Sequence, residues 1–210
     1  MGLKTKKGKG NAKYLNVMFG KVVQKVKADT EGAISRVNKN GDTVYENHYD
    51  SFSGNLVSAR IESTEKYGDF VELVMESDGD HFNVQFPVRS GYGRSFMYRL
   101  PNLEVTEEFE ITPYDFENNE GKRVSGLNLY QNGEKILSFW TRENPGKLPE
   151  LDEVEFQGKT RWDDGKRTKY LVKAFNKKMS GMAPPEPKPE PKPKPKAKVA
   201  EVEEEDDLPF

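Results

Sequence analysis

The sequence predicts a mainly β protein with one short helix, and two features of the chain support this. Its middle contains short segments in which apolar and polar residues alternate, the period-two pattern of half-buried strands. Clusters rich in Gly, Asp and Asn separate those segments, as hairpin turns do. With 210 residues, the chain is long enough for one well-packed core and additional tails.

The first three core strands form a predicted meander. Residues 82–88 (FNVQFPV) place an apolar residue at every second position, and residues 57–61 and 71–75 follow the same alternation. Residues 66–69 (KYGD) and 77–80 (SDGD) lie between these segments and are typical of hairpin turns. We therefore expect three consecutive antiparallel strands within this part of the chain.

A short helix and two further strands are expected after the meander. Residues 94–100 do not alternate and lack a turn signal, so we expect a helix there that ends before Pro101. Residues 108–116 and 123–131 again have the pattern of strands, and the polar loop ENNEG joins them.

The order of these elements predicts the fold. Three strands, a short helix and two more strands are the element order of an OB-fold, a five-strand Greek-key barrel, which we assign to residues 54–140. Asn132-Gly133 is a strong type I′ turn signal that leads into a strand at residues 136–140. Extra N- and C-terminal strands are expected at residues 14–26, 33–49 and 169–175. A different antiparallel barrel or sandwich is the alternative.

The composition argues against several classes of protein. The chain has no cysteine, which excludes disulfides and thiolate metal sites, and its only histidines, His48 and His81, are too few for a His-rich metal site. No apolar run approaches the ~20 residues of a membrane span, and the basic N-terminal residues lack the apolar core of a secretion signal. No phosphate-binding loop, Gly-x-Ser-x-Gly motif or cysteine nucleophile is present. We therefore expect a cytoplasmic protein that is not an enzyme and needs no metal or cofactor.

Charge is segregated along the chain and predicts four regions. Residues 1–13 carry five Lys and no acidic residue, and we expect a disordered basic arm. Residues 14–180 contain the predicted folded domain. Residues 181–200 form a Pro- and Lys-rich linker, whose composition favours an extended polyproline II spacer. Residues 201–210, EVEEEDDLPF, contain six acidic residues and are expected to stay unfolded because like charges repel.

The acidic segment carries a resemblance to a known family. Asp206-Asp207-Leu208-Pro209-Phe210 resembles the terminal peptide of bacterial and phage single-stranded DNA-binding proteins, which is Asp-Asp-Ile-Pro-Phe or a near variant. Leu208 stands where Ile is usual, a volume-conserving change. The linker is rich in Pro and Lys where bacterial members usually have Gly, Gln and Asn, and the predicted folded region is longer. These departures indicate a divergent, phage-type member.

The resemblance implies an OB-fold domain that binds and protects single-stranded DNA, without sequence specificity, during replication, recombination or repair. It also implies that residues 206–210 dock onto replication, recombination and repair proteins. Self-association through an extra edge strand is left open. Three alternatives remain: a β scaffold that recruits partners through the linker and acidic segment, a metal-dependent nuclease, and an RNA-binding or strand-annealing protein.

The DNA-binding candidates combine aromatic and basic side chains, because single strands are bound by a basic groove and by rings on which bases stack. The stacking candidates are Tyr92, Phe96, Tyr98, Tyr114, Phe116, Tyr130, Trp140 and Trp162. The phosphate-binding candidates are Arg89, Arg94, Arg99, Lys122, Arg123, Arg161, Lys166, Arg167 and Lys169. The alternative for each aromatic residue is a packing role, and for each basic residue a solvated surface position.

Overall fold

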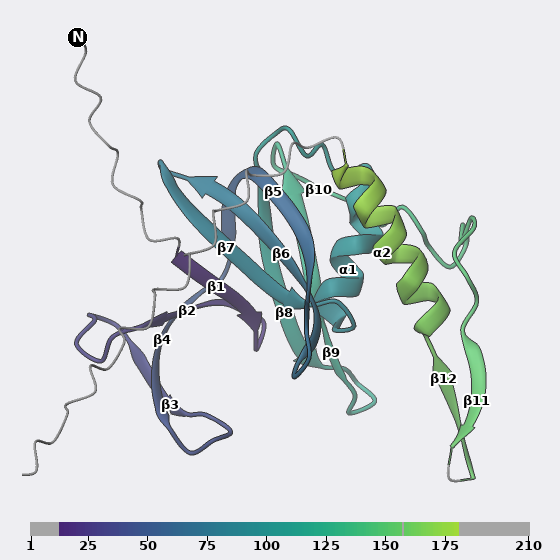
Figure 1. Cartoon of the computed structure of the whole chain (residues 1–210), viewed down its shortest axis with the longest axis horizontal. Coiled ribbons are helices and arrows are strands. Elements are labelled where there is room, and N and C mark those ends of the chain that lie inside the picture. Colours follow the sequence, from purple (N-terminus) through teal and green to yellow (C-terminus); the bar gives the residue numbers. More distant parts are fainter. Residues whose placement is uncertain (1–12, 157, 181–210) are drawn as a thin grey trace, which may run out of the picture.

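The structure is a computed structural model that describes residues 13–156 and 158–180 (Figure 1). The described part is mainly β, with one ten-stranded sheet, a separate two-stranded hairpin and two α-helices. Residues 1–12, the linker and the acidic segment lie outside the described residues, so the predictions made for them concern sequence alone. No helix within the described residues is long and apolar enough to cross a membrane.

The large sheet has the strand order β10-β9-β8-β5-β6-β7-β1-β2-β4-β3. Its strands are β1 (Lys13–Met18), β2 (Lys21–Val26), β3 (Ile34–Val37), β4 (Thr43–Tyr49), β5 (Phe52–Thr64), β6 (Gly68–Ser77), β7 (Asp80–Pro87), β8 (Phe109–Glu117), β9 (Arg123–Gln131) and β10 (Glu134–Lys135). The three strands of the predicted meander and both strands after the predicted helix are confirmed. The ranges 14–26 and 33–49, predicted as added strands, are each a hairpin of two strands, β1–β2 and β3–β4. The separate hairpin of β11 (Asp152–Phe156) and β12 (Lys159–Asp163) was not predicted.

Four strands of the sheet form a Greek key. β5, β6 and β7 are consecutive antiparallel neighbours, and β8 returns to pair with β5 after helix α1 (Gly91–Arg99). The order β8-β5-β6-β7 is the 4-1-2-3 arrangement that defines a Greek key. Within the described residues, however, β7 pairs with β6 and β1, and does not pair with β9. The predicted closure of five strands into a barrel is therefore not found.

The β1–β2 hairpin links the β7 edge of the meander to β8. β1 runs parallel to β7, with Leu15 opposite Val84. Gly20, in the turn after β1, has φ +68°, and a Cβ there would lie 2.8 Å from the backbone nitrogen of Asp115. Only glycine therefore allows so close an approach. The Gly20 N–H donates a hydrogen bond of 2.9 Å to the Tyr92 hydroxyl of α1.

Helix α1 confirms the predicted short helix but begins three residues earlier than the pattern of residues 94–100 indicated. Ser90 caps it, because its hydroxyl accepts a hydrogen bond of 3.1 Å from the Gly93 N–H. A Cβ at Gly91 would lie 2.0 Å from the carbonyl oxygen of Ser125 on β9, so a glycine is required for the close contact between helix and sheet. The pattern of the sequence does not reveal that α1 begins at Gly91, because glycine usually indicates a turn.

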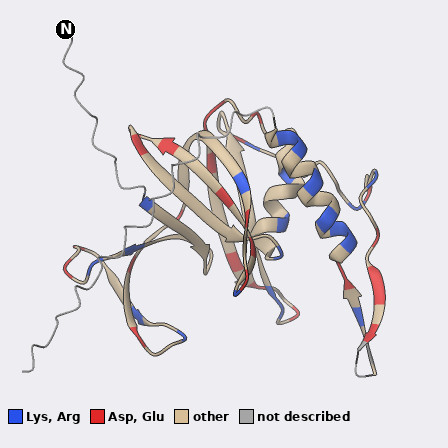
Figure 2. Cartoon of the chain, in the orientation of Figure 1, with Lys and Arg blue, Asp and Glu red and all other residues tan. Residues whose placement is uncertain are grey.

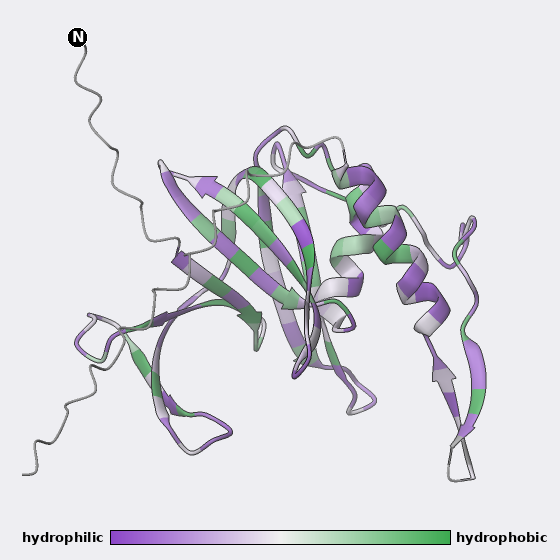
Figure 3. Ribbon diagram, viewed as in Figure 1, coloured by the Kyte–Doolittle hydropathy of each residue, from purple (hydrophilic) through white to green (hydrophobic). Residues whose placement is uncertain are grey.

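The core lies between the sheet and the two helices (Figure 1). Phe86 of β7, Phe96 of α1 and Phe175 of α2 (Gly165–Met179) form a continuous row, with ring centroids 5.5 and 6.5 Å apart. In α2, Leu171, Phe175 and Met179 are buried at a spacing of four residues, as in an amphipathic helix. Figure 3 shows the resulting alternation of hydrophobic and hydrophilic bands along α2.

Two predicted strands are wrong. Residues 169–175 lie inside α2. Their apolar side chains at helical spacing form the face that packs against α1 and the sheet. Residues 136–140 are irregular, although the predicted Asn132-Gly133 turn is present with positive φ at both residues. The strand after that turn is only β10, and the chain then bends inward so that Trp140 packs against two tyrosine rings.

Candidate nucleic-acid interface

The structure separates the predicted DNA-binding residues into three groups. One group consists of side chains that are buried or hydrogen-bonded around α1 and Trp140. A second group lies on β8, β9 and the turn between them. The third group gathers on β12 and α2, where Figure 2 shows basic residues along the whole length of the helix. The groups differ in exposure and in local charge, and these differences decide what each can contact.

Three of the stacking candidates are core residues. Phe96 is fully buried between two other phenylalanine rings, and Tyr92 is buried where α1 meets the β1–β2 turn. Trp140 is only 7% exposed and packs edge-on against Tyr98, with 6.4 Å between ring centroids. A base stacks on an exposed ring face, which the three buried rings do not offer. Tyr92, Phe96 and Trp140 therefore have the packing role that was the alternative for each aromatic candidate.

Arg123 and Tyr92 meet at one carboxylate. Arg123 donates hydrogen bonds of 2.7 and 2.6 Å to the two carboxylate oxygens of Asp115. The Tyr92 hydroxyl donates to the same carboxylate at 3.3 Å and accepts from the Gly20 N–H. The Arg123 hydrogen bonds lower the pKa of Asp115, and burial raises the pKa of Tyr92. Arg123 is therefore held in an intramolecular ion pair that joins β8, β9, α1 and the β1–β2 turn.

The arginines in and before α1 are mostly engaged as well. Arg99 is half-buried, and its guanidinium group donates to the Ser95 carbonyl oxygen at 2.9 Å. Burial lowers the pKa of Arg99. Arg94 donates to a carboxylate oxygen of Asp164 at 2.9 Å, just before α2. Of the three arginines, only the exposed Arg89 has no hydrogen-bond or ion-pair partner in the described part of the chain.

The second group lies in acidic surroundings. Tyr114 is half-buried, and its ring centroid is 5.9 Å from that of the exposed Phe116. Lys122 pairs with a neighbouring glutamate at 3.0 Å. Tyr130 is half-buried and lines a hollow together with two glutamates of the same region. Because carboxylates repel phosphates, this group offers aromatic contact with little uncompensated positive charge.

Helix α2 carries the third group. Residues 165–180 contain six Lys or Arg and no acidic residue. Because one side of the helix is buried, these side chains project from the remaining faces. Lys169, Lys173 and Lys177 are exposed, and no carboxylate within residues 13–156 and 158–180 forms an ion pair with them. Their charges are therefore available to an anionic ligand.

Trp162 of β12 adjoins this basic helix and is 64% exposed. It lines a shallow hollow of about 340 Å³ together with Glu150, Leu151 and Arg167, and Glu153 of β11 lies opposite it in the hairpin. The Arg167 Nε–H donates to a proline carbonyl oxygen at 2.9 Å. Lys166 pairs with Asp152 of β11 at 2.8 Å, and this hydrogen bond raises the pKa of Lys166. Arg161 precedes Trp162 on β12. An exposed indole next to a helix that carries unpaired ammonium groups suits base stacking and phosphate contact, while the carboxylates of Glu150 and Glu153 offset part of the positive charge at Trp162 itself.

An aromatic hollow near the start of β1 was not predicted. The rings of Phe52 and Phe82 pack with 4.9 Å between centroids, and the Lys13 ammonium lies 5.2 Å from the centroid of Phe82. They line a hollow of about 350 Å³ with the exposed Tyr49. Alternation assigns Phe82 to the core, whereas its place at a strand end leaves it partly exposed. The one sequence feature that could have pointed to this hollow is the basic arm, because Lys13 is its last residue.

Neither a search for metal-binding side chains nor the comparisons with known proteins assign a further function to this site. Within the described residues, no three His, Asp or Glu side chains are grouped in a way that could hold a metal ion. No protein-family model, curated protein or solved structure matches this chain.

Proposed function

We propose that this protein binds single-stranded DNA without sequence preference, with α2 and Trp162 as part of its contact surface. The observation that carries the proposal is an exposed indole beside a helix with six basic residues and no acidic one. Lysines on that helix neutralise phosphates and release counterions. A base stacked on Trp162 contributes ~1–3 kcal/mol. Lys169 and Lys173 are central because no carboxylate within the described residues pairs with them.

We further propose that β5–β9 and α1 are an open variant of the OB-fold. The helix lies between the third and fourth of these five strands, and four of the strands have Greek-key order. The β1–β2 hairpin pairs with β7 through β1 and contacts β8, so it occupies the side on which a barrel would close. OB-folds are common binders of oligonucleotides, which is consistent with the proposed ligand.

The acidic segment has a separate role in this proposal. By the resemblance of residues 206–210, it recruits proteins of DNA replication, recombination or repair. The acidic run steers the segment towards a basic partner surface, and Phe210 supplies an apolar anchor. The Pro-rich residues 184–195 span roughly 37 Å when extended, which holds the segment away from the folded domain. The protein then acts by binding and not by catalysis, in the host cytoplasm if its gene is carried by a phage.

Binding of the full chain to fluorescent oligo-dT, measured by anisotropy at increasing salt, tests the proposal. We expect the logarithm of the association constant to fall linearly with the logarithm of salt, by about 0.7 for each phosphate contact. Lys169→Glu/Lys173→Glu should lower both the affinity and this slope. Lys27→Glu/Lys39→Glu is the matched control, because it makes the same charge change at exposed positions outside α2.

The possible results separate the alternatives. Equal losses in the two charge variants would show that net charge, and not α2, governs affinity. Absence of salt-dependent binding would remove the nucleic-acid function and leave the scaffold alternative. Tighter binding of oligo-U than of oligo-dT would replace DNA by RNA as the ligand.

A further inference from the structure

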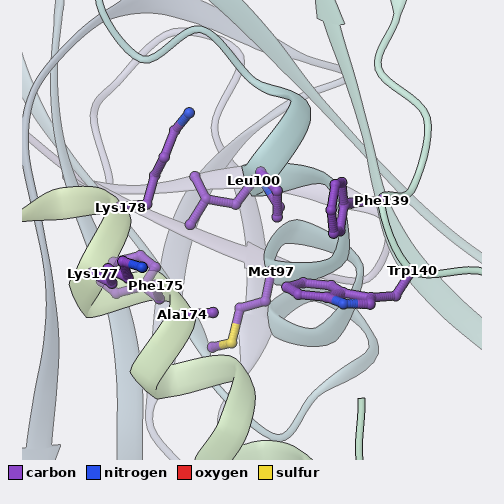
Figure 4. A pocket seen from close by; sticks show the side chains of 9 residues that line it. Met97, Leu100, Phe139, Trp140, Ala174, Phe175, Lys177 and Lys178 are labelled. Carbon is purple, nitrogen blue, oxygen red and sulfur yellow. The ribbon is translucent and has the colours of Figure 1, made fainter. Parts of the chain in front are cut away.

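A pocket of about 430 Å³ lies between the C-terminal half of α2, the end of α1 and the segment after β10. It is termed the helix pocket below. Its lining includes Met97, Leu100, Phe139, Trp140, Lys177 and Lys178. Figure 4 shows the two lysines of α2 on one side and the Phe139 and Trp140 rings on the other, with Met97 between them. Of the residues that the sequence predicted to bind DNA, only the buried Trp140 lines this pocket.

Phe139 presents an exposed ring on a backbone segment that is held in place. The residue is 50% exposed, and its ring lies edge-on to Trp140 with 5.1 Å between centroids. Its backbone N–H donates a hydrogen bond of 2.7 Å to the carbonyl oxygen of Tyr98. Two residues earlier, the Leu137 carbonyl oxygen accepts a hydrogen bond of 3.0 Å from the Asn102 side chain. The ring is therefore positioned before any ligand arrives, which reduces the entropy lost when a flat group stacks on it.

The charge at the helix pocket is positive. Lys177 is exposed and has no ion-pair partner among the described residues. Lys178 interacts electrostatically with the carboxylate of Glu104, which compensates part of its charge. No acidic side chain of the described part of the chain lines the pocket, whereas glutamates line the hollows at Trp162 and Tyr130. The pocket therefore suits an apolar group that is attached to an anion.

A row of lysines leads along α2 to this pocket. Lys169, Lys173 and Lys177 recur at every fourth residue, so they lie along one side of the helix, with a rise of about 6 Å from each to the next. All three are exposed. The first two are the phosphate contacts of the proposed function, and the third lines the pocket. A strand whose phosphates follow this row therefore brings a base to the helix pocket.

We propose that the helix pocket holds one nucleobase of the bound strand, stacked on Phe139, with an adjacent phosphate paired to Lys177. This inference rests on the proposed function and extends it to an aromatic residue that the sequence patterns did not indicate. A nucleobase has two apolar faces, and its phosphate supplies an anion for the Lys177 ammonium group. A volume of about 430 Å³ accommodates a base with its sugar. Because every base has a stacking face, the contact requires no particular sequence.

Photocrosslinking of the full chain to oligo-dT that contains 5-iodouracil tests this arrangement, because the irradiated base reacts with aromatic side chains in contact with it. Trypsin cuts after lysine and arginine, so it places Phe139 and Trp162 in separate peptides, residues 136–142 and 162–166. We expect mass spectrometry to find the crosslinked base in residues 136–142, at Phe139. The wild-type protein is sufficient for this measurement.

Affinity measurements on variants give an independent test. Phe139→Ala should weaken oligo-dT binding by about 5- to 140-fold, which corresponds to the ~1–3 kcal/mol of one stacked base at about 1.4 kcal/mol for each tenfold. Leu137→Ala is the matched control, because Leu137 is 70% exposed in the same segment but does not line the pocket, and it should leave the affinity unchanged. Lys177→Gln should lower the slope of log affinity against log salt by about 0.7, the value of one phosphate contact.

Two results would overturn the inference while leaving the proposed function intact. One is salt-dependent binding with crosslinks at residues 162–166 or elsewhere and none at residues 136–142. The other is equal affinity of the wild-type protein and Phe139→Ala for oligo-dT. Absence of oligo-dT binding by the full chain would instead remove the proposed function, and the nucleobase with it. The binding and crosslinking measurements therefore distinguish the two failures.

Discussion

Helices α1 and α2 both combine aromatic and basic residues, yet they use them in opposite ways. In α1, the Tyr92 and Phe96 rings are buried, and the guanidinium groups of Arg94 and Arg99 bond to nearby oxygen atoms. In α2, apolar side chains fill the buried stripe, while most of its lysines are exposed. The exposed Trp162 lies on β12, just before the start of α2.

The difference comes from the layers in which the helices lie. α1 contacts β7 and β9 as well as α2, so it is covered on more than one side (Figure 1). α2 contacts β5, α1 and the short turn after α1, and its remaining faces are left to solvent. A cluster of aromatic and arginine residues therefore does not identify a nucleic-acid surface unless the element that carries it is exposed. The following predictions test this contrast, from the largest expected effect to the smallest.

Phe96→Ala should lower the free energy of unfolding by about 3–5 kcal/mol, because it leaves a cavity between two packed rings. Trp162→Ala should change that free energy by less than about 0.5 kcal/mol, since its ring is mainly exposed. Urea denaturation of the full chain, followed by circular dichroism, measures both. Similar losses for the two variants would contradict the contrast in burial.

Trp162→Ala should instead weaken oligo-dT binding by about 1–3 kcal/mol, the value of one stacked base. Phe116→Ala is the comparison, because Phe116 has a similar exposure but lies on β8 and not next to the basic helix α2, so it should contribute less. Anisotropy titrations at one salt concentration compare the two. A larger loss for Phe116→Ala would move the interface from α2 to the β8–β9 turn.

Tyr92→Phe should destabilise the fold by about 1 kcal/mol, because it removes the hydroxyl that joins the Gly20 N–H to Asp115. Tyr67→Phe is the control, since Tyr67 is exposed and its hydroxyl forms no hydrogen bond in the part of the chain that the structure describes. Urea denaturation again gives the free energies. Equal stabilities of the two variants would show that this contact does not hold α1 in place.

The Arg123–Asp115 ion pair should give a small, pH-dependent contribution. The pKa of Asp115 is lowered in the folded state, so its stabilisation is fully present above the unfolded pKa of ~3.9. That stabilisation is lost as the pH falls through the folded pKa. The stability difference between the wild-type protein and Asp115→Asn should therefore be constant above about pH 5 and shrink below about pH 4. Denaturation at several pH values measures it, and a difference independent of pH would exclude the carboxylate charge as its source.

Local pairing explains why much of the sheet was predicted correctly. β5, β6 and β7 pair with their neighbours in sequence, so alternation and turn residues were sufficient to identify them. The same locality explains why Arg161, Trp162 and Lys166 were predicted together, since they are neighbours in the chain. Residues 169–175 contain apolar residues at spacings that fit either a strand or a helix, and packing against β5 and α1 selects the helix.

The sequence by itself determined the meander, the positions of its turns, the segregation of charge and the chemistry of the acidic segment. Each of these depends on residue type and on spacing within about ten residues. Only the tertiary structure decided that β1 pairs with β7, that the sheet stays open, and that Tyr92, Phe96 and Trp140 are buried. It also created a pocket of about 430 Å³ from three separate segments, namely the end of α1, the segment after β10 and the C-terminal half of α2. The physical reason is that periodicity reveals which face of an element is apolar, whereas burial depends on partners that are distant in the chain.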